Sequence, residues 1–119
     1  MLKLVDIKKN YVMKDQEPVR ALRGITLNFR KNEFVAILGP SGCGKTTLLN
    51  ILGTLDSDFE GELSIMNNVI NRNCSDEFLS NLRLKSIGIV FQSFNLISTM
   101  TAKENVLLPM IINDKLSKK

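Results

Sequence analysis

The first third of the chain alternates hydrophobic and polar positions, which is the pattern of a strand with one buried face. Residues 2–7 form one candidate strand, and residues 25–29 form another, with Thr26 and Asn28 on the polar face. The polar residues 14–18 indicate a connection between the two strands. Strands of this kind are typical of antiparallel sheets, so we expect an N-terminal antiparallel β-subdomain.

Two later segments are hydrophobic without alternation, at residues 34–38 and 87–91. Each has the pattern of a strand buried on both faces of a parallel sheet, so we predict two such strands. Between them the residues 45–55 predict a helix. The apolar side chains expected on its inner face are Leu48, Leu49, Ile51, Leu52 and Leu55.

Three further elements are predicted after this helix. Residues 62–70 indicate a hairpin with Asn67 and Asn68 at its turn. Ser75 is suited to cap a helix that ends near Lys85, with acidic residues in its first turn and basic residues in its last. Residues 101–104 match a capping box that opens a last helix. Pro109 is expected to kink or end that helix, and residues 111–114 are interpreted as its frayed end.

Composition narrows the class of protein. The chain has 119 residues, 44% hydrophobic and 24% charged, which suits one globular domain and argues against disorder. It has no His and two Cys, so neither a disulfide framework nor a zinc site is expected. Its net charge of +4 is dispersed, which argues against nucleic acid as a partner. No apolar run is long enough to predict a transmembrane helix or a signal peptide, so cytosolic residence is the default.

One motif carries chemistry, because residues 39–46 fit G-x-x-x-x-G-K-[ST], the phosphate-binding P-loop. The glycines let successive backbone N–H groups approach phosphate oxygens, and the helix N-terminus that follows adds further N–H donors. Lys45 would place its charge on the β- and γ-phosphates, Thr46 would ligate Mg²⁺, and Thr47 would reach the α-phosphate. The residues expected to bind the nucleotide in this loop are Gly39, Pro40, Ser41, Gly42, Cys43, Gly44, Lys45, Thr46 and Thr47. The thiol of Cys43 is expected to be alkylatable and protected by ATP.

The sequence around the loop resembles one family of P-loop proteins. Residues 37–49 resemble the Walker A segment of ABC-transporter ATPases, residues 90–92 resemble their Q-loop, and Tyr11 resembles their adenine-stacking A-loop aromatic. Four further stretches look like the subgroup that includes the lipoprotein-release, macrolide-export and antimicrobial-peptide-export ATPases: residues 21–25, 49–53, 91–96 and 101–106.

The resemblance implies roles for residues outside the P-loop. Tyr11 would stack on adenine, with Val19 lining the adenine and ribose side. Gln92 would touch Mg²⁺ and the attacking water, so Lys45 and Gln92 are the expected catalytic residues and Thr46 and Gln92 the expected metal ligands. Partners would be a transmembrane permease subunit and a second nucleotide-binding subunit, which places the protein on the cytoplasmic face of the membrane. The residues expected to receive the permease are Phe94, Leu96 and Met100.

The implied fold class is α/β, a P-loop NTPase core with an N-terminal antiparallel β-subdomain. Residues 1–119 would form a partial nucleotide-binding domain that stops at the start of the helical subdomain. The chain contains no L-S-G-G-Q signature, no Walker B Asp-Glu pair and no switch His. We therefore expect it to bind MgATP without hydrolysing it alone. A non-catalytic ATP-binding or interaction module is the alternative, whereas a GTPase or small-molecule kinase is disfavoured because N-K-x-D is absent.

Overall fold

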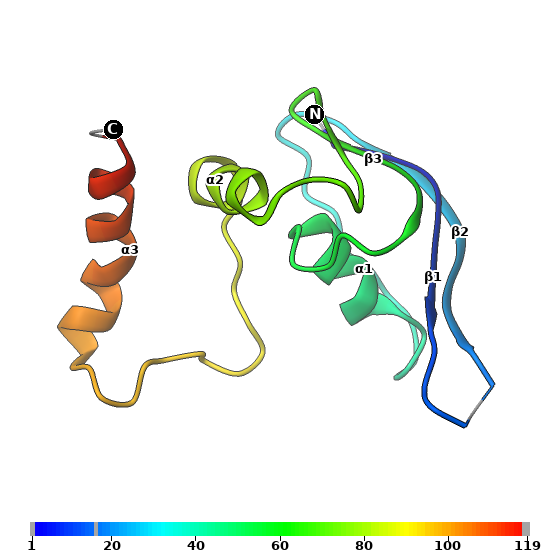
Figure 1. Ribbon diagram of the computed structural model, residues 1–119, viewed down its shortest axis with the longest axis horizontal. Coiled ribbons are helices and arrows are strands. Elements are labelled where there is room, and N and C mark those ends of the chain that lie inside the picture. Colours follow the sequence, from blue (N-terminus) through cyan, green and yellow to red (C-terminus); the bar gives the residue numbers. More distant parts are fainter. Residues whose placement is uncertain (1, 16, 118–119) are drawn as a thin grey trace.

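A computed structural model describes residues 2–15 and 17–117 of the chain. A sheet with one helix packed on it lies at one side of the molecule, and two further helices follow at the other side (Figure 1). The described elements are β1 (Leu2–Tyr11), β2 (Val19–Phe29), α1 (Lys45–Leu52), β3 (Glu60–Ile65), β4 (Asn68–Ile70), α2 (Asp76–Ser86) and α3 (Ala102–Ser117).

The sheet has the strand order β2-β1-β3-β4, and every neighbouring pair is antiparallel. This confirms the antiparallel β-subdomain, with its two alternating segments paired as β1 and β2. The predicted hairpin is also present as β3 and β4. Its turn lies at Met66 and Asn67, one residue earlier than expected, and both have positive φ values of 48° and 68°. Two positive φ values are the geometry that a tight two-residue hairpin requires.

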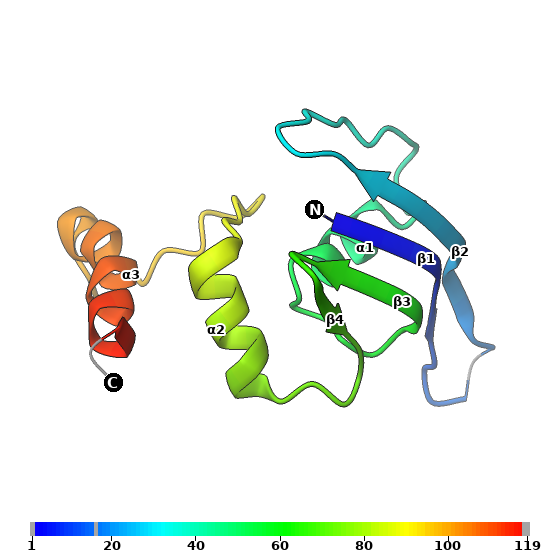
Figure 2. The ribbon, with the colours of Figure 1, turned by 90° about the horizontal axis from the view of Figure 1, so that it is seen from above.

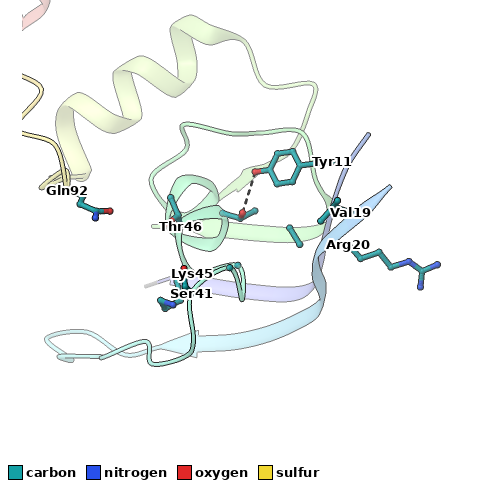
Figure 3. A pocket seen from close by; sticks show the side chains of 11 residues that line it. Tyr11, Val19, Arg20, Ser41, Lys45, Thr46 and Gln92 are labelled. Carbon is teal, nitrogen blue, oxygen red and sulfur yellow. Dashed lines mark hydrogen bonds between the residues drawn. The ribbon is translucent and has the colours of Figure 1, made fainter. Parts of the chain in front are cut away.

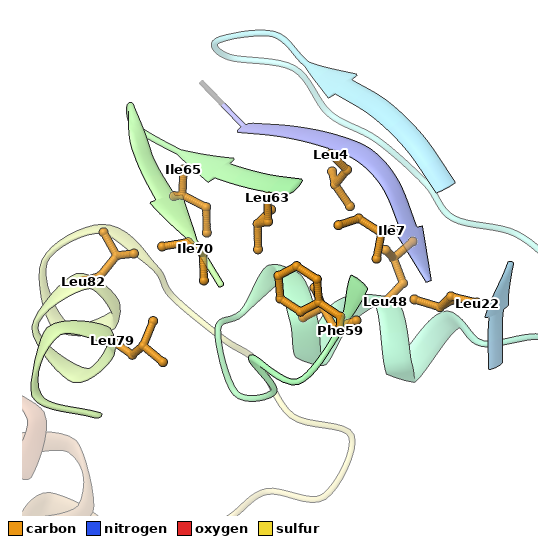
Figure 4. Close-up of a cluster of buried hydrophobic side chains, with 11 residues drawn as sticks. Leu4, Ile7, Leu22, Leu48, Phe59, Leu63, Ile65, Ile70, Leu79 and Leu82 are labelled. Atoms are coloured by element: carbon orange, nitrogen blue, oxygen red, sulfur yellow. The ribbon is translucent and has the colours of Figure 1, made fainter. Parts of the chain in front are cut away.

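The hydrophobic core lies between the sheet and α1, and α2 closes one end of it (Figure 4). Leu4, Ile7 and Leu63 project from the sheet and are fully buried. Leu48 and Ile51 are the buried residues of α1. These two residues are three positions apart, so they lie on the same face of the helix, and this face packs on the sheet.

The predicted helix over 45–55 is shorter than expected, because α1 ends at Leu52 and Leu55 lies beyond it. Its predicted inner face is also too broad, because Leu49 is exposed, as is Leu55. Both side chains line a cavity of about 310 Å³ together with Ile89, Val90 and Phe91. Helical spacing gives the direction of a side chain, but the packing partner decides whether that side chain is buried. Here the described residues fill only the side of α1 that faces the sheet.

The two predicted parallel strands are absent from the described residues, which corrects the expectation for 34–38 and 87–91. Both segments run without ladder partners, and most of their side chains are exposed: Phe34 by 96%, Leu38 by 90% and Val90 by 100%. Ile37 and Ile87 are the exceptions, since they are partly buried against the core. A strand exists only when a neighbour completes its backbone hydrogen bonds, and a hydrophobic run cannot supply that neighbour.

The two C-terminal helices begin as predicted. The Ser75 hydroxyl accepts a hydrogen bond from the Phe78 N–H at 3.2 Å and caps α2. At α3 the Glu104 carboxylate accepts from the Thr101 N–H at 2.7 Å, and the Glu104 N–H donates back to the Thr101 hydroxyl at 3.3 Å. These are the two reciprocal bonds of a capping box.

The end of α3 differs from the prediction. Pro109 lies inside the helix, which continues to Ser117, so residues 111–114 are helical rather than frayed. Proline has no backbone N–H, so it removes one hydrogen bond from the helix. The other backbone hydrogen bonds of a long helix can still hold the helix together. The helix stands apart from the sheet, beyond α2, in two perpendicular views (Figures 1 and 2). Within residues 2–15 and 17–117, no helix is long and apolar enough to cross a membrane.

Candidate functional site

A cavity of about 580 Å³ lies where the ends of β1 and β2 meet the P-loop and the start of α1 (Figure 3). Its walls come from segments that are up to eighty residues apart in the chain. The lining residues are Tyr11, Val19, Arg20, Ala21, Ser41, Gly42, Gly44, Lys45, Thr46, Thr47 and Gln92. The fold therefore gathers most of the predicted site residues around one space.

The loop geometry explains the glycines of the motif. Gly42 and Gly44 have φ values of 79° and 96°, which L-residues with a side chain rarely adopt. A Cβ at Gly44 would also lie 2.6 Å from the backbone carbonyl oxygen of Ala21. Gly44 is thus the one lining position where both the dihedral angle and the space exclude a side chain.

The helix that opens at this cavity has free donors. The N-cap residue of α1 is Gly44, and no side chain caps the helix start. The first N–H of the helix ladder is that of Leu48, which donates to the Gly44 carbonyl at 2.9 Å. The N–H groups of Lys45, Thr46 and Thr47 come before it, and the first turn of a helix has no internal acceptors for such groups. Aligned N–H groups and the positive end of the helix dipole favour an anion at this point.

Lys45 holds the loop in shape. Its Nζ donates to the backbone carbonyls of Gly39 and Pro40, each at 2.7 Å. The ammonium has three donors, and the third points to the Cys43 sulfur, a weak acceptor that a phosphate oxygen would replace. Gly39 and Pro40 do not line the cavity and act on it through these carbonyls. The exposed Cys43 lies 3.7 Å from Lys45 Nζ, and it lines a neighbouring cavity with Arg20 rather than this one.

The opposite wall holds the sole tyrosine of the chain. The Tyr11 hydroxyl donates to the Thr47 hydroxyl at 3.4 Å, which joins the end of β1 to the first turn of α1. Val19 is the direct ladder partner of Tyr11 across the β1–β2 pair. An aromatic ring and an aliphatic side chain therefore form one apolar wall of the cavity, while the P-loop forms the polar wall.

Two lining residues were not predicted from the sequence, Arg20 and Ala21. Arg20 extends away from the space in Figure 3. Ala21 contributes its backbone, whose carbonyl lies against Gly44. Neither residue type carries a signal for this position, because their place follows only from the pairing of β2 with β1.

A divalent cation would find neutral ligands here. Thr46 and Gln92 both line the cavity, which offers a hydroxyl and an amide. Among the described residues, no group of three or more Cys, Asp or Glu side chains could hold a metal ion. A Mg²⁺ ion therefore fits this site only together with the anionic oxygens of a bound phosphate, which is how Mg²⁺ is commonly held in nucleotide sites.

Comparison with known proteins shows the family. Residues 22–119 match the family model described as ABC transporter. The ABC transporter ATP-binding protein MJ0796 of Methanocaldococcus jannaschii is 48% identical over 111 residues, which are 93% of this chain and 46% of that protein. The lipoprotein-releasing system ATP-binding protein LolD 1 of Rhodopseudomonas palustris is 43% identical over 113 residues, 95% of this chain and 50% of the relative. The macrolide export ATP-binding/permease protein MacB of Campylobacter fetus is 47% identical over 111 residues, 93% of this chain and 17% of the relative.

A solved structure agrees with this assignment. The dimeric MJ0796 cassette in a post-hydrolysis state, bound to ADP and Pi, superposes with a TM-score of 0.89 at 48% identity. The superposition covers 95% of this chain and 48% of the cassette, and the chain spans half or less of the length of the relatives named above. The chain belongs to the ABC transporter family, as the N-terminal portion of an ATP-binding domain in the subgroup of LolD, MacB and MJ0796.

Proposed function

We propose that the chain binds MgATP in the 580 Å³ cavity, within a nucleotide-binding subunit that drives export across a membrane. The observation that carries the proposal is the pairing of two walls in one space. One wall has an uncapped helix N-terminus and a lysine, which suit a triphosphate. The other has Tyr11 and Val19, which suit a purine and its ribose.

The roles follow from the chemistry of each group. Stacking of a base on an aromatic ring such as Tyr11 is typically worth about 1–3 kcal/mol. The backbone N–H groups of residues 41–47 and the Lys45 donor that now points to the Cys43 sulfur would meet the phosphate oxygens. Thr46 and Gln92 would complete the coordination of Mg²⁺, and the Gln92 amide would also orient a water molecule.

The transport context is part of the same proposal. Relatives of this chain are named for macrolide export and lipoprotein release, which supports export rather than import. The MJ0796 cassette is dimeric with ADP and Pi bound, which supports a second nucleotide-binding subunit as a partner. A permease would bind the same subunit at the cytoplasmic face of the membrane. Phe94, Leu96 and Met100 lie in the connection between α2 and α3, where Phe94 and Leu96 are exposed to such a partner and Met100 is half-buried.

We expect the 119-residue chain by itself to bind nucleotide without turnover. Phosphoryl transfer needs a group that positions water and further charges that stabilise the transition state. The sequence has no His and no L-S-G-G-Q loop, so Gln92 is the one expected contributor beyond the P-loop. Phosphate release should therefore match that of the Lys45→Ala variant. Release clearly above that level would contradict the second half of the proposal.

The binding half is tested by titrating a trinitrophenyl-ATP probe with and without Mg²⁺. Lys45→Ala should weaken binding by more than tenfold under both conditions, because it removes the charge nearest the phosphates. Thr46→Ala and Gln92→Ala should weaken binding only when Mg²⁺ is present. Lys85→Ala, at the end of α2 and remote from the cavity, is the matched control and should bind like the unmodified chain. Equal binding by Lys45→Ala and Lys85→Ala would refute the site.

A further inference from the structure

Lys9 is the one charged side chain among the buried residues described in the structure, and it is only 7% exposed. It lies on β1, two residues before Tyr11. A buried ammonium is unfavourable unless every donor has an acceptor. Lys9 therefore needs an explanation that the nucleotide cavity by itself does not supply, because Lys9 does not line that cavity.

The acceptors come from the loop between α1 and β3. Lys9 Nζ lies 2.9 Å from the nearer Asp56 carboxylate oxygen and 3.3 Å from Asp58 Oδ2, and it also donates to the Asp58 backbone carbonyl. The loop is ordered in turn by the Asp58 N–H, which donates to Asp56 Oδ1 at 2.9 Å. Burial lowers the pKa of Lys9, but the hydrogen bonds and charges of the two aspartates outweigh it and raise the pKa overall. Lys9 is thus a cation fixed in one place.

That fixed cation lies against the Tyr11 ring, with Nζ 5.2 Å from the ring centroid. This is within the range of a cation–π interaction. Lys9 lines a separate cavity of about 100 Å³ with Asp58 and Arg72, whereas Tyr11 lines the nucleotide cavity. The ammonium therefore contacts the ring without lining the cavity proposed for the nucleotide.

The ring is restrained at two points as a result. Lys9 lies at its face, and the hydroxyl donates to Thr47 at 3.4 Å. Both restraints exist before any ligand arrives. A binding group that is already ordered loses less conformational entropy when the ligand binds, which increases affinity.

We propose that Lys9 is a positioning residue for Tyr11: its ion-paired ammonium holds the ring so that the free face meets the adenine base. This inference rests on the proposed nucleotide site and adds a specific partner to it. It predicts that Lys9 affects recognition of the base and leaves recognition of the phosphates unchanged.

The chain offers a direct reporter, because it has one tyrosine and no tryptophan. Intrinsic fluorescence therefore reports on Tyr11 alone. The full 119-residue chain would be titrated with MgATP and, separately, with magnesium tripolyphosphate, which lacks the base. Fluorescence anisotropy of the free protein would measure how tightly the ring is held.

Lys9→Met should lower the anisotropy of Tyr11 and weaken MgATP binding by about three- to tenfold, the size expected for one partly desolvated cation–π contact. Tripolyphosphate binding should stay unchanged, and Lys9→Arg should restore most of the lost affinity. Lys8→Met is the matched control, because Lys8 is the neighbouring lysine, is half-buried, and pairs with Asp6 rather than with Asp56 or Asp58. Lys9→Met leaves the charges of Asp56 and Asp58 without their partner, which could prevent folding. If circular dichroism shows that Lys9→Met does not fold, the triple variant Lys9→Met, Asp56→Asn, Asp58→Asn is used in its place, because it removes these charges as well.

The outcomes separate the two proposals. Equal anisotropy and equal MgATP binding in Lys9→Met and Lys8→Met would overturn the positioning role while leaving the nucleotide site intact. Equal loss of MgATP and tripolyphosphate binding would also overturn it, because the role would then be general stability. If the unmodified chain binds neither ligand, the proposed function fails and the positioning role fails with it.

Discussion

Single residues set the shape of the candidate site, and Gly44 is the position that tolerates a side chain least. Its backbone supplies the N-cap of α1 with φ of 96°, and the carbonyl of Ala21 occupies the space where a Cβ would be. The P-loop and β2 are therefore in van der Waals contact through backbone atoms. A change of one methyl group at this position acts on both elements.

Gly44→Ala should lower the free energy of unfolding by about 1–3 kcal/mol, because the left-handed backbone and the close contact both oppose a side chain. A urea titration followed by circular dichroism measures this as a lower midpoint. Gly88→Ala is the matched control, since Gly88 has no positive φ and open space where its Cβ would be. Equal midpoints for the two variants would show that the contact with Ala21 relaxes at little cost.

At the scale of elements, side chains close in sequence cap the N-termini of α2 and α3 and so fix where these helices begin. Ser75 caps α2, and Thr101 with Glu104 forms the capping box of α3. Asn105 extends the second of these contacts, because its side chain bonds the backbone of Ile97 at 2.8 Å and of Met100 at 3.2 Å. The start of α3 is thereby tied to the loop that precedes it.

The capping box makes the start of α3 sensitive to acid. Hydrogen bonds from the Thr101 N–H and hydroxyl lower the pKa of Glu104 below its ordinary value of 4.5. A group with a lowered pKa stabilises the folded state above its unfolded pKa and loses that contribution as the pH falls through the folded pKa. Helicity at 222 nm should therefore fall below pH 4.5 more in the unmodified chain than in Glu104→Gln. Identical pH profiles would mean that the carboxylate contributes nothing to α3.

At the scale of the whole molecule, the sheet and α1 form a core that is closed on one side only. Residues 34–38 and 87–91 leave large apolar side chains in solvent, with Phe34 and Val90 almost fully exposed. A folded protein in solution rarely keeps such a surface uncovered. Ile89, Val90 and Phe91 line one cavity with Leu49 of α1, so part of this exposed surface lies on the side where the P-loop helix lacks packing.

The 119-residue chain should therefore associate with itself as its concentration rises, which light scattering or sedimentation would measure. Val90→Lys should reduce association, because it places a charge in the apolar surface. Val12→Lys is the matched control, since Val12 is also exposed but lies just after the end of β1, outside the two exposed segments. A monomer at all concentrations, or equal effects of the two variants, would contradict this interpretation.

The sequence by itself determined the features whose physical causes are local. The helix start at Lys45, the caps at Ser75 and Thr101, and the hairpin around residues 62–70 depend on neighbours a few positions away, and each was confirmed as structure. The alternating segments also predicted the antiparallel sheet, because a period of two records which face is buried. Resemblance then supplied the roles of Tyr11 and Gln92, and both side chains line the cavity.

Only the tertiary structure decided the features that depend on distant partners. Residues 34–38 and 87–91 read as buried strands, but burial and pairing are properties of what packs against a segment, and the described residues provide no ladder partner. The burial of Lys9 against Asp56 and its contact with Tyr11 carry no signal in the sequence, since a lysine in an alternating strand reads as a solvated residue. The sequence therefore determined the glycine-rich loop and helix start that form one wall of the cavity, and the fold decided how the aromatic ring on the opposite wall is held.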